Sequence, residues 1–188
     1  MVLVHLHQLW LPMILSAVIV FVASSLVHMV LTYHRSDYQK LPNEDAVTTA
    51  IRTGNAGAGQ YMFPHMSMAD MRSPEGLEKF KKGPVGFLTL RRSGAPGMTK
   101  DLVQWFVYSL FVGLFVAYVA GRTVAPGAGY LPVFRIGGTV AFLAYAGAAP
   151  IDSIWRGQPW SVTFKMMFDG LLYACLTAGT FGWLWPKV

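Results

Sequence analysis

The residues with the clearest metal-binding chemistry lie close together at positions 62–71. Met62, His65, Met66, Met68 and Met71 place four thioethers and one imidazole within this stretch. Thioether sulfurs are soft ligands that suit copper, and Cu(I) above all. Methionine also fills irregular apolar gaps, and this spacing matches no closed metal geometry. The sequence therefore leaves copper open as a cofactor at these five residues, and it predicts no other cofactor.

Two ionisable residues, His28 and Asp169, fall inside long apolar runs. Ionisable groups within a membrane are costly, and they often serve as proton relays, metal ligands or ion sites. A structural interpretation competes with this functional one. Asp169 is one helical turn from Lys165, the spacing of a local ion pair, and His28 can hydrogen-bond a neighbouring carbonyl. We expect His28 and Asp169 at similar depths, where the two side chains could pair.

The element that carries His28 is an apolar run at residues 9–33, which contains no Lys, Arg, Asp or Glu. At about 1.5 Å per residue, a helix of this length exceeds a hydrocarbon core of roughly 30 Å. A helix also satisfies its own backbone hydrogen bonds in lipid. Further apolar runs occupy residues 102–120, 133–149 and 166–185. We expect Thr99 to cap the first of these helices, Pro150 to end the second and Pro186 to end the third. The sequence predicts an all-α membrane protein with four transmembrane helices.

Between the first two runs, the composition becomes hydrophilic, and residues 34–101 are predicted to form a small α+β insertion outside the membrane. Asn43 can cap a helix at residues 44–53, and Ser73 followed by Pro74 can start a second helix that ends at residues 83–84. Residues 60–63 and 85–90 are β-prone and are expected to pair. We therefore divide the chain into 1–33, 34–101 and 102–188. An insertion this small is near the lower limit for an independent core, so we expect it to lean on the membrane surface, its own helices or a partner.

The distribution of Lys and Arg predicts the orientation. If the insertion is cytoplasmic, twelve of the fifteen basic residues lie on that side, and only Arg122, Arg135 and Lys187 lie on the other. Cytoplasmic loops carry such an excess. We expect residues 34–100 in the cytoplasm and both termini outside it. The net charge of +6 then points to anionic lipid head groups and not to nucleic acid, because no basic patch with interleaved aromatic residues is present.

Small residues recur every four positions in two of the predicted helices. Such stripes let helix backbones approach closely in lipid, where hydrophobicity no longer drives helices together. We favour packing within the bundle, with docking on another subunit as the alternative. The two stripes are Ser109, Gly113, Ala117 and Gly121, and Gly170, Ala174, Ala178 and Gly182.

Several segments resemble a family of bacterial four-helix integral membrane proteins with no assigned activity. The resemblance rests on residues 40–47, 59–64, 83–88, 152–160 and 168–170, and it spans most of the chain. It implies a bacterial inner-membrane location, and it carries no catalytic residues over to this sequence. The chain also contains no Gly-rich phosphate loop, His-Glu-x-x-His motif, Cys-x-x-Cys pair or nucleophile elbow.

The function predicted from these features is that of a non-catalytic accessory or assembly subunit in a larger membrane complex. Its expected partners are the lipid bilayer and other membrane protein subunits. One alternative is a metal-handling, copper or redox protein that uses the Met/His stretch or the pair of His28 and Asp169. Another is a small transporter that oligomerises to build a pathway, although the predicted bundle has few interior polar groups.

Overall fold

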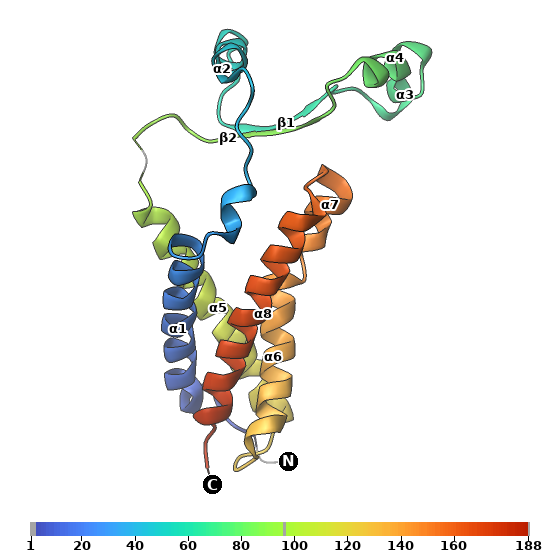
Figure 1. The fold of residues 1–188 in the computed structure, drawn as a ribbon. Helices are drawn as coiled ribbons and strands as arrows, with labels where there is room; N and C mark the ends of the chain where they lie inside the picture. Colours follow the sequence, from blue (N-terminus) through green and yellow to red (C-terminus); the bar gives the residue numbers. More distant parts are fainter. Residues whose placement is uncertain (1–2, 96, 188) are drawn as a thin grey trace. The chain divides into compact units, whose positions relative to one another are not determined.

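The computed structural model describes residues 3–95 and 97–187, and it is mostly helical with a small two-stranded sheet (Figure 1). The chain forms two compact units. The first, termed the bundle unit, comprises Met1–Asp37, Gly97–Ile154 and Gln158–Val188. The second, termed the insertion unit, comprises Tyr38–Pro96 with Trp155–Gly157. This division places the start of the insertion unit a few residues after the predicted one.

The bundle unit is a ring of four long helices. They are α1 (Trp10–Met29), α5 (Thr99–Thr123), α6 (Tyr130–Ala146) and α8 (Trp160–Trp183). Helix α1 packs against α5 and α8, and α6 packs against the same two helices from the other side. Short 3₁₀ helices at Leu6–Leu9 (η1) and Tyr33–Ser36 (η2) flank α1, and α7 (Ala149–Arg156) lies between α6 and α8. Backbone hydrogen bonds join Val4 to Gly121 near the end of α5, and Gly127 of the α5–α6 connection to Pro186.

Three segments of the described chain are long and apolar enough to cross a membrane: Leu6–Met29, Thr99–Thr123 and Tyr130–Arg156. Helix α8 has 24 residues but is not among them. Its Asp, Gly and Thr residues lower its mean hydropathy, although its length is similar to that of the other long helices. The structure therefore bears out three of the four predicted membrane helices, and the fourth stays a prediction.

Both small-residue stripes face neighbouring helices of the bundle unit. Ser109, Gly113, Ala117 and Gly121 are all buried on α5, and a Cβ atom added at Gly113 would lie 3.3 Å from the backbone oxygen of Met13 in α1. On α8, Gly170, Ala174 and Ala178 are buried, Gly182 is half-buried, and a Cβ atom at Gly170 would lie 2.7 Å from the Cβ of Ala146 in α6. The small residues thus line close contacts of α5 with α1 and of α8 with α6.

The insertion unit has the elements that the sequence predicted. Helices α2 (Glu44–Thr53) and α4 (Pro74–Lys82) begin after Asn43 and Ser73, and the Ser73 hydroxyl accepts a hydrogen bond from the Gly76 amide at 3.0 Å. Strand β1 (Gly59–Phe63) pairs antiparallel with β2 (Gly86–Leu90), and Tyr61 lies opposite Leu88. A further short helix, α3 (Met68–Met71), precedes α4. The predicted helices and strands of this region are confirmed, but Asn43 occupies the N-cap of α2 without a side-chain capping hydrogen bond.

Some helix ends differ from the predictions. Helix α1 stops at Met29, so the apolar run predicted to be helical through residue 33 turns at its end into η2. Pro150 lies in the first turn of α7, so it does not mark the end of the preceding helix. A first turn accepts proline because the missing N–H would have no helical partner there. Met98, not Thr99, occupies the N-cap of α5. The early end of α1 matters most, because it brings Tyr33 and His34 into the bundle unit.

Candidate functional site

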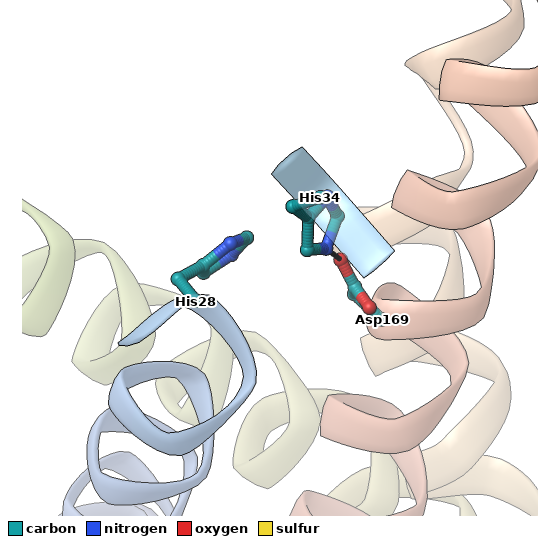
Figure 2. A group of neighbouring side chains, drawn as sticks. All are labelled: His28, His34 and Asp169. Atoms are coloured by element: carbon teal, nitrogen blue, oxygen red, sulfur yellow. Dashed lines mark hydrogen bonds and ion pairs between the residues drawn. The ribbon is translucent and has the colours of Figure 1, made fainter. Parts of the chain in front are cut away.

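A polar cluster in the bundle unit forms around Asp169, which lies in the third turn of α8 and is only 4% exposed. The Tyr33 hydroxyl donates a short hydrogen bond to its Oδ1 atom, and Nε2 of His34 lies 2.8 Å from its Oδ2 atom (Figure 2). Both oxygens of this buried carboxylate are therefore engaged by residues of η2, about 135 positions away in the sequence. A buried carboxylate needs such partners, because burial without them costs several kcal/mol.

His34 joins two carboxylates. Its Nε2 atom faces Asp169, and its Nδ1 atom lies 2.6 Å from Oδ2 of Asp37. The other oxygen of Asp37 lies 2.6 Å from Nζ of Lys165, which also donates to the Tyr33 carbonyl at 2.7 Å and to the Ser36 hydroxyl at 2.8 Å. A chain of hydrogen bonds thus runs from α8 at Lys165, through η2, and back to α8 at Asp169.

His34 lies between two carboxylates, and the Asp37 carboxylate is also paired with the Lys165 ammonium. Burial raises the pKa of Asp37, but hydrogen bonds from Lys165 and His34 lower it by more, so its pKa lies below the usual value. Burial and the bond to Asp169 raise the pKa of Tyr33, which keeps the phenol protonated as a donor.

His28 completes the cluster from the last turn of α1. Its ring lies 4.6 Å from the ring of His34, centroid to centroid, and its side chain is exposed. One ligand atom from each of His28, His34 and Asp169 can be chosen so that all three lie within 4.8 Å of one another (Figure 2). Two imidazoles and a carboxylate are a donor set that first-row transition ions accept.

The structure places His28 and Asp169, the two ionisable residues singled out in apolar runs, in one cluster, but it gives Lys165 a different partner from the one predicted. Lys165 pairs with Asp37, a residue of the η2 region, although Asp169 is one turn away on the same helix. Sequence reasoning missed Tyr33, His34 and Asp37. Their signal was the His-x-x-Asp spacing directly after an apolar run, which places an imidazole and a carboxylate at the end of a predicted helix.

The Met/His stretch lies in the insertion unit, and its residues are spread over several elements. Met62 is in β1, His65 and Met66 follow it in a turn, and Met68 and Met71 are in α3. His65 and Met68 are exposed, whereas the other three are half-buried. Copper binding by these five residues stays a prediction.

Comparisons with protein-family models, with curated proteins and with solved structures found no match to this chain.

Proposed function

We propose that this protein is a non-catalytic accessory or assembly subunit of a membrane complex, and that its insertion unit docks on a partner protein. The observation that carries the proposal is the lack of a core in the insertion unit. Among its described residues, Gly76 is the only one that is buried. A segment of this size that buries so little apolar surface gains little from folding alone, and a partner can supply the missing contacts.

The β1–β2 ribbon favours a protein partner over the flat surface of a bilayer. Residues directly opposite each other in an antiparallel pair share one face of the sheet. Tyr61 and Leu88 are opposite each other on one face, and Met62 and Phe87 are opposite each other on the other. Large apolar side chains therefore occupy both faces, and Phe87 is 51% exposed. A bilayer surface covers one face of a ribbon, whereas a protein cleft can cover both.

The ribbon also has two unpaired edges, since β1 and β2 form a two-stranded sheet. Isolated ribbons of this kind are marginally stable in water, and a third strand or a packed helix is needed for independent stability. Open edges are templates for strand addition by another chain. The proposed partner therefore packs on the ribbon faces and can extend its edge.

We place the protein in the bacterial inner membrane, with α8 as a fourth membrane span, the insertion unit in the cytoplasm and both termini outside it. Support comes from the twelve-to-three distribution of basic residues and from the packing of α8 along α6 and α1. Single cysteines at Ser93 and Gly129, in a Cys175→Ser background, test this orientation. We expect membrane-impermeant reagents to label Gly129→Cys in intact cells and to spare Ser93→Cys. The reverse pattern would refute the orientation.

In-cell photo-crosslinking tests the docking proposal. A photoreactive phenylalanine analogue is placed at Phe87, at Tyr61 on the opposite face, and at exposed Trp183 in the bundle unit as a control. We expect both ribbon positions to give the same protein adduct, and the control to give lipid adducts or a different protein. Lipid adducts alone at both ribbon positions would contradict the proposal.

A further inference from the structure

We propose that His28, His34 and Asp169 form a binding site for a divalent first-row transition ion, with Zn²⁺ as the expected occupant. Their ligand atoms lie within 4.8 Å of one another, and they come from α1, η2 and α8 of the bundle unit (Figure 2). Zinc holds nitrogen and oxygen ligands at about 2.0–2.2 Å, which separates neighbouring ligands by roughly 3.5 Å. To reach this spacing, His28 must approach, and its exposed side chain is the least constrained of the three. The 2.8 Å separation of His34 Nε2 and Asp169 Oδ2 must also widen.

The surroundings of His34 orient it as a metal ligand. In metal sites, a ligating histidine usually donates its other ring N–H to a carboxylate, which fixes the tautomer and the ring orientation. Nδ1 of His34 lies 2.6 Å from Asp37, and this bond directs Nε2 at Asp169. Lys165 holds the second oxygen of Asp37 at 2.6 Å, so the orienting carboxylate is itself fixed. A histidine with only a surface role would not need an orienting carboxylate that is itself held in place by a lysine.

The contacts of Asp169 also suit a metal ligand. Its Oδ1 atom accepts the hydrogen bond from Tyr33, and this bond can persist when Oδ2 binds a cation. Oδ2 of Asp169 lies 2.8 Å from Nε2 of His34. A cation bound by both atoms takes the place of this contact once the two atoms separate to roughly 3.5 Å, and it leaves both outer bonds in place. The third ligand, His28, then approaches from α1.

The donor set selects the class of ion. Two imidazoles and one carboxylate suit Zn²⁺ and its neighbours, whereas Cu(I) prefers thioethers and thiolates. Three protein ligands also leave a coordination position open, as in sites that exchange or process a ligand and unlike closed structural sites. This site is separate from the Met/His stretch of the insertion unit, and it does not depend on the docking proposal.

Metal titration of the full-length, metal-depleted protein in lipid nanodiscs tests the site. Co²⁺ reports coordination through its visible absorption, and competition by Zn²⁺ gives the affinity. We expect one Co²⁺ per chain with the spectrum of a low-coordinate site, displaced by one Zn²⁺. His28→Gln is the main variant, because its exposed side chain leaves the Tyr33, His34 and Asp169 contacts in place, and it is expected to lower the Zn²⁺ affinity at least about 100-fold.

Two further variants sharpen the result. Asp37→Asn acts through His34, and loss of such an outer partner costs about 10–100-fold in metal affinity. His65→Gln, in the insertion unit, is the matched control and is expected to leave the affinity unchanged. Circular dichroism and gel filtration establish that each variant is folded. Unchanged Zn²⁺ affinity in a folded His28→Gln protein, or its loss in His65→Gln, would overturn the proposal.

Discussion

The bundle unit and the insertion unit differ in what surrounds their small residues. In the bundle unit, a Cβ atom at Gly170 would lie 2.7 Å from the Cβ of Ala146, and one at Gly121 would lie 2.5 Å from the carbonyl oxygen of Val4. In the insertion unit, a Cβ atom at Gly57 or Gly94 would meet nothing within 4 Å. The helices of the bundle unit therefore pack closely against one another, while most side chains of the insertion unit are not covered by other parts of that unit.

Among the described glycines of the insertion unit, the closest contact of this kind is at Gly76, and it is local. A Cβ atom at Gly76 would lie 2.0 Å from the Asp70 carbonyl oxygen, so α4 can pack on α3 only because residue 76 is glycine. This contact joins two short helices within a dozen residues and does not extend to the β1–β2 ribbon. The bundle unit thus gains stability from close contacts between its helices, whereas the insertion unit makes few such contacts.

The largest expected effect is that of adding bulk at Gly170. A leucine there would force α8 away from α6, and we expect Gly170→Leu to lower the free energy of unfolding by about 3 kcal/mol or more, at the upper end of overpacking costs. Unfolding by SDS in mixed micelles, followed by tryptophan fluorescence, measures it. Gly57→Leu is the matched control in open space and is expected to change stability by less than about 0.5 kcal/mol. Equal effects at the two glycines would remove the contrast between the units.

An intermediate effect is expected from the ion pair between Lys165 and Asp37. Its side chains are 24% and 9% exposed, so a lone Asp37 carboxylate would lose a partner in a largely desolvated place. We expect Lys165→Gln to cost about 1–3 kcal/mol in the same assay, as for a hydrogen-bonded charged group left without its partner. Lys187→Gln, at an exposed lysine near the C-terminus, is the control.

A double-mutant cycle separates the pair from its neighbours. If Lys165 acts through Asp37, the variant with both Lys165→Gln and Asp37→Asn should cost less than the sum of the single changes, by about 0.5–3 kcal/mol. Additive costs would mean that Lys165 stabilises η2 mainly through the Tyr33 carbonyl and the Ser36 hydroxyl.

Local sequence signals predicted the insertion unit well. Asn43 and Ser73 precede α2 and α4 as predicted, and residues with β propensity form the paired strands. Caps and turns act over a few residues, so one stretch of sequence contains the whole signal. The same holds for the small-residue spacing of α5 and α8, which a helical repeat brings onto one face.

The polar cluster was predicted only in part, because its contacts span most of the chain. His28 and Asp169 were identifiable as charged or polar residues in apolar surroundings. His34 was not, because it lies where an apolar run meets a hydrophilic loop, and its role depends on α1 ending at Met29. Hydropathy alone does not mark that end, since Val30 and Leu31 are as apolar as the helix before them. The contacts of Tyr33 and His34 with Asp169 are tertiary, and no local pattern encodes them.

A smaller effect is expected from a hydrogen bond between helices α5 and α1. The indole Nε1 atom of Trp105 donates to the Ser24 hydroxyl at 2.8 Å. Such bonds between membrane helices contribute about 0.6 kcal/mol on average, and we expect Trp105→Phe to cost about this much in the SDS assay. Trp183→Phe is the matched control, because Trp183 is 74% exposed. A cost above about 2 kcal/mol would instead point to the indole ring, which packs against Tyr173, as the main contribution.

The smallest expected effect on stability is that of Phe87→Ser, and it tests the comparison most directly. Phe87 is 51% exposed, so its replacement removes little buried apolar surface from the isolated protein, and we expect a change below about 0.5 kcal/mol. The matched control is Phe181→Ser in the bundle unit, where the side chain is fully buried in this structure and its loss should cost about 3–5 kcal/mol. In cells, Phe87→Ser should reduce partner binding more than Phe181→Ser does. Phe87→Ser should abolish the protein adduct formed from a photoreactive residue at Tyr61, whereas a control substitution at exposed Glu78 should preserve it. If Phe87→Ser destabilises the isolated protein as much as Phe181→Ser does, the ribbon has a core of its own, and the reason for assigning it an external partner disappears.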